Sequence, residues 1–259
     1  MGDSDFVIPE DRLPEGFAED VDDPPAHPAP ARPAATVVLM RDADDGLEVL
    51  LLRRVHSSGF VPGAWVFPGG RVDAGDATPA VLERTQGLTL EDAEARLDLQ
   101  DAEIPATAYY LAALREAFEE TGILVGRSAR GDRIATAHSE PSVLHARERL
   151  LAGMHSFADA LEELGAFLDS SAMEYIAHWI TPTVEPRRYD TRFFAAAVDE
   201  DTVPTIHQEE ISHAIWVAPR EALERSEAGT LPMVFPTLKT LEALAGLDST
   251  ASVLQDFRS

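Results

Sequence analysis

Cysteine is absent from the 259-residue chain, and lysine occurs once, at Lys239. The missing cysteines exclude disulfides, thiolate catalysis and cysteine-based zinc sites. No apolar run approaches the roughly 20 residues that a membrane-spanning helix needs. The N-terminus is acidic and proline-rich, which is unlike a secretory signal or a transit peptide. We therefore expect a cytoplasmic protein without a membrane partner.

Basic residues are scarce as well, because 46 acidic residues face only 21 bases, for a formal net charge of -25. Such a surface repels nucleic-acid backbones, which argues against broad DNA or RNA binding. It would also repel a phosphorylated small substrate unless a cation or local arginines intervened. The sites where acids or arginines gather are therefore the informative ones.

The chain is long enough for one large domain or two small ones. Residues 1–33 are rich in proline and acids and are predicted to form a disordered tail, with the folded domain at 34–247 and a C-terminal tail at 248–259. Strands are predicted at residues 35–40, 48–53, 65–67, 177–180, 192–198 and 214–217. Helices are predicted at residues 89–99, 107–121, 219–227 and 236–245, with a helical stretch over roughly 141–168. This alternation predicts an α/β protein in which helices cover a sheet.

Residues 107–121 form the most strongly periodic predicted helix. At about 100° per residue, Glu116, Glu119 and Glu120 fall within one arc, and apolar residues cluster on the opposite side. Gly122 stands where a helix C-cap is expected. Three like charges at this spacing destabilise a bare helix, and a divalent cation with oxygen ligands would neutralise them. The alternative is a solvated acidic face, which is the better interpretation of a glutamate-rich helix taken alone.

A second element, the glycine-rich segment from Phe67 to Asp76, decides between these interpretations. Its glycine pair, Gly69 and Gly70, permits close approach of the backbone to a ligand or a helix. Together, the two elements resemble the Nudix box, in which a glycine and a spaced glutamate precede the pattern Arg-Glu-aliphatic-x-Glu-Glu-x-Gly-aliphatic. Gly70 takes the first position, and Asp76 replaces the glutamate. The second half, residues 115–123, matches without a gap.

The sequence departs from the common box in one respect, because an insertion at residues 77–107 separates its two halves. It resembles the interrupted-box branch of the family, which contains coenzyme A diphosphatases. The similar segments are Gly63-Ala64-Trp65-Val66-Phe67-Pro68-Gly69-Gly70, Trp179-Ile180-Thr181-Pro182 and residues 185–194. The resemblance covers roughly residues 35–245. It implies the Nudix fold, a mixed sheet between helices (α/β/α), with a helical insertion and the further helical segment at 141–168.

The resemblance also implies metal-dependent hydrolysis of a diphosphate linkage in a nucleoside diphosphate derivative, with coenzyme A or acyl-CoA as the leading substrate. Hydrolysis of ADP-ribose or NADH stays open, as does a non-catalytic Nudix-like module that senses nucleotides. An acidic scaffold explains the N-terminal tail but not the box. The expected partners are a small-molecule nucleotide diphosphate and a second copy of the chain in a homodimer.

Three groups of site residues follow from the resemblance. Mg²⁺ or Mn²⁺ would be held by Glu116, Glu119, Glu120 and Gly70. The catalytic residues would be Glu119, Glu116, Arg115 and Glu210, with Glu209 as an alternative general base. The substrate would be bound by Arg54, Gly69, Gly70, Arg187, Arg188 and Arg192. Arg115 is expected to orient the carboxylates, and ion pairing with Glu185 and Asp190 is the alternative role of Arg192.

Overall fold

Seven strands form the central sheet of the computed structural model, which describes residues 28–55, 62–100, 102–134 and 136–258. Five of them lie in the order β10-β2-β1-β9-β8, with β3 paired to β2 and β4 paired to β1. The bounds are β1 Ala31–Ala43, β2 Gly46–Arg54, β3 Trp65–Val66, β4 Gly69–Arg71, β8 Met173–Ile180, β9 Arg188–Ala197 and β10 Ile211–Val217. The sheet is mixed, because β1 and β9 run parallel whereas the other pairs are antiparallel.

Strands β1 and β2 bury apolar residues on both faces. Val37 and Leu39 of β1 pack in one buried cluster, whereas Val38 and Met40 pack in a second cluster on the opposite face. Strand β2 repeats this division between the two clusters. A sheet that is buried on both sides gives continuous apolar runs in its sequence, as the predicted strands did.

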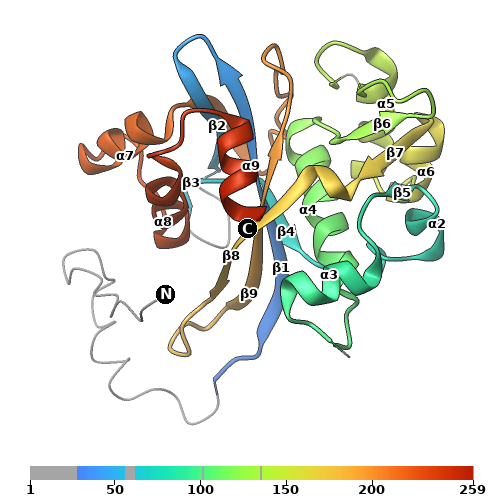
Figure 1. Ribbon diagram of the computed structural model, residues 1–259, viewed down its shortest axis with the longest axis horizontal. Coiled ribbons are helices and arrows are strands. Elements are labelled where there is room, and N and C mark those ends of the chain that lie inside the picture. Colours follow the sequence, from blue (N-terminus) through green and yellow to red (C-terminus); the bar gives the residue numbers. More distant parts are fainter. Residues whose placement is uncertain (1–27, 56–61, 101, 135, 259) are drawn as a thin grey trace.

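Helices cover both faces of this sheet (Figure 1), which confirms the predicted α/β/α arrangement. One face carries α4 (Ala106–Thr121), α3 (Leu90–Leu97), α5 (Pro141–Leu151) and α6 (Phe157–Glu163). The other face carries α7 (Pro219–Glu227), α8 (Phe235–Leu244) and α9 (Thr250–Arg258). The predictions for α3, α4, α7 and α8 are confirmed to within two residues at each end.

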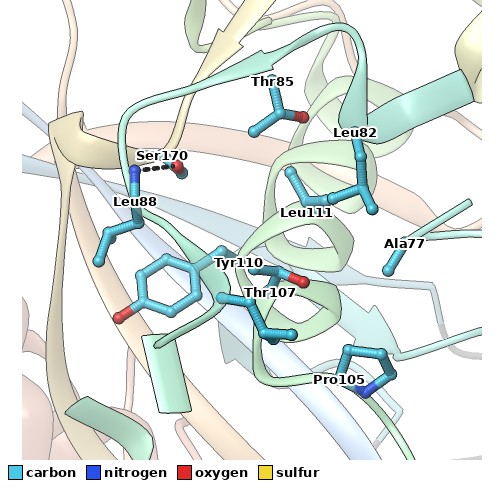
Figure 2. A pocket seen from close by; sticks show the side chains of 10 residues that line it. Ala77, Leu82, Thr85, Leu88, Pro105, Thr107, Tyr110, Leu111 and Ser170 are labelled. Carbon is cyan, nitrogen blue, oxygen red and sulfur yellow. Dashed lines mark hydrogen bonds between the residues drawn. The ribbon is translucent and has the colours of Figure 1, made fainter. Parts of the chain in front are cut away.

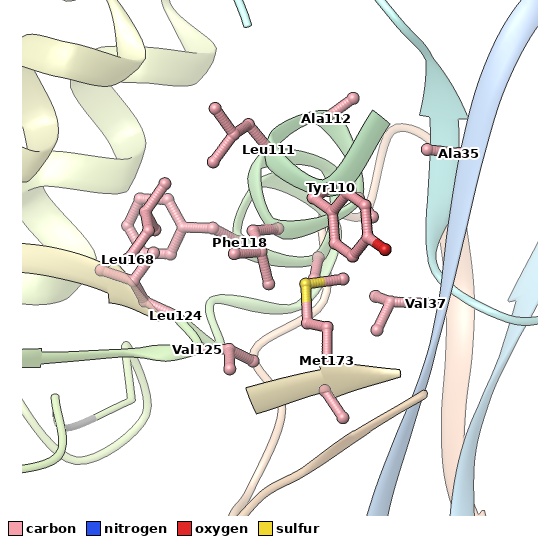
Figure 3. Close-up of a cluster of buried hydrophobic side chains, with 14 of the residues drawn as sticks. Ala35, Val37, Tyr110, Leu111, Ala112, Phe118, Leu124, Val125, Leu168 and Met173 are labelled. Atoms are coloured by element: carbon pink, nitrogen blue, oxygen red, sulfur yellow. The ribbon is translucent and has the colours of Figure 1, made fainter. Parts of the chain in front are cut away.

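Helix α4 lies at the centre of the first core (Figure 3). The ring of Tyr110 lies 4.3 Å from that of Phe194 on β9, and the ring of Phe118 lies 6.4 Å from that of Phe157 on α6. The helix ends as predicted at Gly122, which adopts the left-handed conformation with a φ of 68°. Because these contacts fix the apolar side of α4, they also fix the direction of its acidic side.

The residues that interrupt the box form a small unit of their own. The insertion contains α2 (Pro79–Leu82), β5 (Thr85–Gln86) and α3, which begins at a capping box formed by Thr89 and Asp92. Strand β5 pairs with β7 (Ala166–Asp169), which also pairs with β6 (Gly126–Ser128). A 3-10 turn, Ser170–Ala172, follows β7.

The predicted helical stretch over 141–168 is therefore wrong at its C-terminal end. Helices α5 and α6 occupy most of it, but residues 166–168 belong to β7. Their strand partners lie in the insertion and directly after α4, so the pairing depends on segments that are distant in the sequence. Local periodicity carries no information about such partners.

Regular structure includes some described residues of both predicted tails. Residues 1–27 lie outside the described residues, but Ala31–Pro33 already belong to β1 and pair with β9. The predicted tail at 248–259 contains α9, where Val253 is buried and Asp42 accepts hydrogen bonds from the backbone nitrogen and hydroxyl of Thr250. Such a short helix is stabilised by the sheet beneath it rather than by its own sequence. The exact domain boundaries stay a prediction.

In the described part of the chain, no helix has both the length and the apolar character needed to cross a bilayer. The predicted cytoplasmic compartment stays a prediction.

Candidate active site

The glycine turn (Gly69 and Gly70) is in contact with the acidic side of helix α4, despite the insertion that separates them in the sequence. Strand β4, which the sequence did not predict, pairs antiparallel with β1 and carries both glycines. Gly69 donates from its backbone nitrogen to Oε2 of Glu120 at 3.1 Å. Gly70 has no room for a side chain, because a Cβ there would overlap the carboxyl group of Glu116. Glycine at position 70 is what allows the backbone to approach Glu116, whereas a Cβ at Gly69 would overlap Ala35 and Thr36 of β1.

Arg115 joins the two halves of the box. Its Nε donates to Asp76 at 2.6 Å, and its Nη1 donates to Glu116 at 2.9 Å and to Glu119 at 3.3 Å. Asp76 is buried, and its second oxygen accepts from the backbone nitrogen of Asp73 at 2.7 Å. Charge-assisted hydrogen bonds to a planar guanidinium restrict the orientation of each carboxylate. This arrangement supports the orienting role that the sequence suggested for Arg115.

The last turn of α4 is held by a residue that the sequence did not indicate. Arg147 of α5 is buried and donates from Nε and Nη2 to the backbone carbonyl of Glu119, at 3.0 and 2.7 Å. The backbone nitrogen of His207 donates to the carbonyl of Glu120 at 3.0 Å. Both contacts satisfy carbonyls near the helix end that would otherwise lack partners. No local pattern marks Arg147, because the bond joins two helices across 28 positions of the sequence.

Burial dominates the electrostatics of the three glutamates. It raises the pKa of Glu116 to about 7, although the charge of Arg115 opposes this shift. Burial also raises the pKa of Glu119 and, with a contribution from the charge of Glu116, that of Glu120. For Arg115, burial acts downward, but the hydrogen bond to Asp76 and the neighbouring carboxylates raise its pKa overall. One guanidinium therefore faces several acids, and burial favours the uncharged form of the glutamates.

The donor chemistry of this cluster suits a hard divalent cation, because carboxylate oxygens are the ligands that such ions prefer. Over the described residues, however, no group of three or more acidic or histidine side chains is arranged as a ready metal site. Arg115 bridges Glu116 and Glu119, while Glu120 accepts from Gly69. Arg115 would therefore compete with a metal ion for the first two carboxylates. The assignment of metal ligands stays a prediction.

Two further predicted residues lie beside the acidic cluster. Strands β10 and β2 are antiparallel, which sets Glu210 and Arg54 at the same end of the pair. Burial is the main reason that the pKa values of Glu119 and Glu120 are raised, and the charge of Glu210 adds to both shifts. The charge of Arg54 acts in the opposite direction on the pKa of Glu120. Glu209 and Glu210 are both exposed. The electrostatic effect of Glu210 on Glu119 and Glu120 favours it over Glu209 as a residue that acts on the site.

Arg188 and Arg192, which were both predicted to bind substrate, lie at different places along strand β9. Arg192 of β9 is buried, forms an ion pair with Asp190 and lies 5.8 Å from the ring centre of Tyr109 on α4. The ion pair is the alternative role that the sequence left open for Arg192. Arg188 lies roughly 13 Å further along the same strand and donates to two backbone carbonyls. Of Arg188 and Arg192, only Arg192 lies level with the glycine turn across the sheet. Arg192 and Gly70 both pair with Ala35 of β1, on its two sides.

Comparisons with known proteins agree with this arrangement. A family model described as the NUDT19 Nudix domain matches residues 27–244. The chain is 30% identical to a Gallus gallus protein named acyl-coenzyme A diphosphatase NUDT19, over 78% of this chain and 62% of that protein. The Homo sapiens protein of the same name is 29% identical, over 78% of this chain and 58% of that protein. The chain therefore spans about three-fifths of these relatives.

A solved structure gives the same result at the level of the fold. The crystal structure of a NUDIX hydrolase from Alicyclobacillus acidocaldarius is 30% identical, with a TM-score of 0.73, and the match covers 88% of this chain and 96% of that one. The α/β/α fold, with its glycine turn against an acidic helix, thus defines a Nudix domain. Within this class, the chain belongs to the family of the NUDT19 Nudix domain, which confirms the predicted resemblance to the interrupted-box branch.

Proposed function

We propose that the protein hydrolyses the diphosphate linkage of coenzyme A or of an acyl-CoA with the help of a divalent metal ion. The observation that carries this proposal is the contact of Gly69 and Gly70 with Glu120 and Glu116. It brings backbone groups and carboxylates together at one place, which is what diphosphate chemistry requires. The names of the two vertebrate relatives support coenzyme A derivatives as the substrate class.

Glu116, Glu119 and Glu120, together with the carbonyl of Gly70, would hold Mg²⁺ or Mn²⁺. When bound, such an ion neutralises charge on the diphosphate and makes a bound water more acidic. Glu210 would accept a proton from the attacking water. The new bond joins the water oxygen to phosphorus while the bond from that phosphorus to the bridging oxygen breaks, giving adenosine bisphosphate and a phosphopantetheine product.

The arginines would provide the positive charge that an acidic protein otherwise lacks. Arg54 acts electrostatically on Glu120, so a substrate phosphate beside that carboxylate would also lie near Arg54. Arg192 would bind a phosphate only by sharing its guanidinium with Asp190. Arg187 and Arg188 would contact more distant parts of the nucleotide. The predicted homodimer stays part of this proposal.

The substrate assignment is tested by incubating the purified protein with coenzyme A, an acyl-CoA, ADP-ribose and NADH in the presence of Mg²⁺ or Mn²⁺. We expect adenosine bisphosphate from the two coenzyme A species, and no product after chelation of the metal. Chromatography separates the products directly. Cleavage of ADP-ribose alone would exclude the coenzyme A assignment, and nucleotide binding without any cleavage would favour the sensing module.

Replacing Gly70 with alanine is expected to lower kcat/KM by about 10²-fold, because the added Cβ would displace the carboxyl group of Glu116. Gly75→Ala, in the turn that follows β4, is the matched control, since nothing lies within 4 Å of the position that its Cβ would take. Steady-state kinetics and thermal unfolding should be measured for both variants. Equal kinetics for the two alanine variants would contradict the role given to the turn.

A further inference from the structure

A cavity of about 310 Å³ lies between the insertion and the N-terminal half of α4 (Figure 2). The insertion contributes Ala77, Leu82 and Leu90, and α4 contributes Thr107 and Leu111. The remaining lining residues are uncharged as well. In a protein with a net charge of -25, a wall without any acid or base is suited to an apolar group.

The mouth of this cavity carries apolar side chains that water can reach. Leu82 and Leu90 are 42% and 47% exposed, and both line the cavity. They are two of the five large hydrophobic side chains that are exposed within the described residues, and the other three do not line it. Single exposed leucines need no explanation, but two at one uncharged cavity form an apolar entrance.

Both walls of the cavity belong to chain segments that also carry residues of the acidic cluster. On one side, Ala77 directly follows Asp76, which accepts the hydrogen bond from Arg115. On the other side, Leu111 and Thr107 precede Glu119 on α4 by eight and twelve residues. At about 1.5 Å per residue, these positions lie roughly 12–18 Å along the helix from Glu119. A ligand that is bound at the carboxylates and extends by this length toward the N-terminal end of α4 would reach the cavity.

We propose that this cavity binds the acyl chain of a coenzyme A thioester whose diphosphate lies at Glu116, Glu119 and Glu120. The inference rests on the function proposed above and assigns the insertion a role in it. The pantetheine arm that separates the diphosphate from the thioester contains two amide bonds. Its extended length is comparable to that of a peptide of four or five residues, roughly 13–18 Å, which matches the separation along α4.

This assignment makes the length of the acyl chain a determinant of affinity. Each methylene that enters the cavity should tighten binding by up to about fourfold, until the cavity is filled. Free coenzyme A lacks this contact, so its binding should depend only on the nucleotide and the pantetheine arm. The insertion would thus distinguish long thioesters from short ones without changing the chemistry at the diphosphate.

The test uses a Leu82→Asp, Leu90→Asp double variant, which places two charges at the entrance and leaves the buried core intact. The control is Met154→Asp, since Met154 is 65% exposed and does not line the cavity. Binding of coenzyme A and of its dodecyl thioether is measured by calorimetry on each protein, and KM and kcat are measured for coenzyme A and lauroyl-CoA. Both ligands keep the diphosphate that the protein would cleave, so the calorimetry is run with EDTA and without added metal, which separates binding from turnover.

The wild type and Met154→Asp should bind the thioether at least tenfold more tightly than coenzyme A. The double variant should bind both about equally, with a higher KM for lauroyl-CoA and unchanged kcat and KM for coenzyme A. An unchanged preference for the thioether in the double variant would overturn the cavity assignment and leave the hydrolase proposal standing. If coenzyme A were bound but never cleaved, the hydrolase proposal would fail, while the thioether preference would still decide the cavity.

Discussion

Glu119→Gln is expected to lower kcat by about 10²–10³-fold while leaving the fold intact. The side chain of Glu119 is 24% exposed, whereas that of Glu116 is 15% exposed and Glu120 is buried. Glu119 is therefore the most accessible of the three glutamates. Loss of a metal-binding carboxylate removes several kcal/mol of transition-state stabilisation, and about 1.4 kcal/mol corresponds to a factor of ten in rate. Glutamine keeps the shape of the side chain and can still accept from Arg115.

The control for this variant is Glu224→Gln, which removes an exposed charge on α7, on the opposite face of the sheet. Single-turnover kinetics with saturating coenzyme A and a titration of Mn²⁺ binding should be compared for both proteins. We expect weaker Mn²⁺ binding only for Glu119→Gln. Wild-type turnover in this variant would remove Glu119 from the proposed mechanism.

Arg115→Met is expected to destabilise the protein by about 3–5 kcal/mol, since it leaves the partner of a buried ion pair without a counter-charge. The side chain of Arg115 is 12% exposed and that of Asp76 only 1%. Methionine has a similar length but provides none of the hydrogen bonds to Asp76, Glu116 and Glu119. Urea unfolding monitored by circular dichroism measures the change in the free energy of unfolding.

The double variant Arg115→Met, Asp76→Asn should recover part of this loss, because the buried carboxylate is then neutral as well. Arg225→Met is the matched control, since Arg225 forms an exposed pair with Glu221 and should contribute less than about 1 kcal/mol. An equally small change in the free energy of unfolding for Arg115→Met and Arg225→Met would show that the ion pairs of Arg115 do not stabilise the fold. Recovery in the double variant would identify Asp76 as the group that Arg115 neutralises.

The glycine turn and the helix were recognisable as two halves of one site because the spacing of residue types within each half is kept, although the insertion separates the halves. That they meet could be expected from the resemblance, but how they meet could not. The sequence predicted no strand at Gly69 and Gly70, whereas the structure has strand β4 paired with β1. Glycine has little intrinsic preference for strands, so only the neighbouring strand revealed this element.

Helix α4 was likewise predicted from the sequence, whereas the residues that contact its end were not. Its start, its left-handed end at Gly122 and the common arc of its glutamates followed from periodicity and capping rules. Arg147, which donates to the carbonyl of Glu119, was missed because its sequence neighbours reveal nothing about what lies 28 positions earlier. For the same reason, the strand at residues 166–169 and the helix α9 were missed.

The sequence by itself determined the elements with local rules: the apolar strands, the amphipathic helices with their caps, and the arc of acids on α4. It also determined the absence of cysteine chemistry. Only the tertiary structure decided which groups compensate those acids, which strand receives the glycine turn, and where the insertion leaves an uncharged cavity. Periodicity and capping act over a few residues, whereas ion pairs, strand pairing and cavities depend on chain segments that meet only after folding.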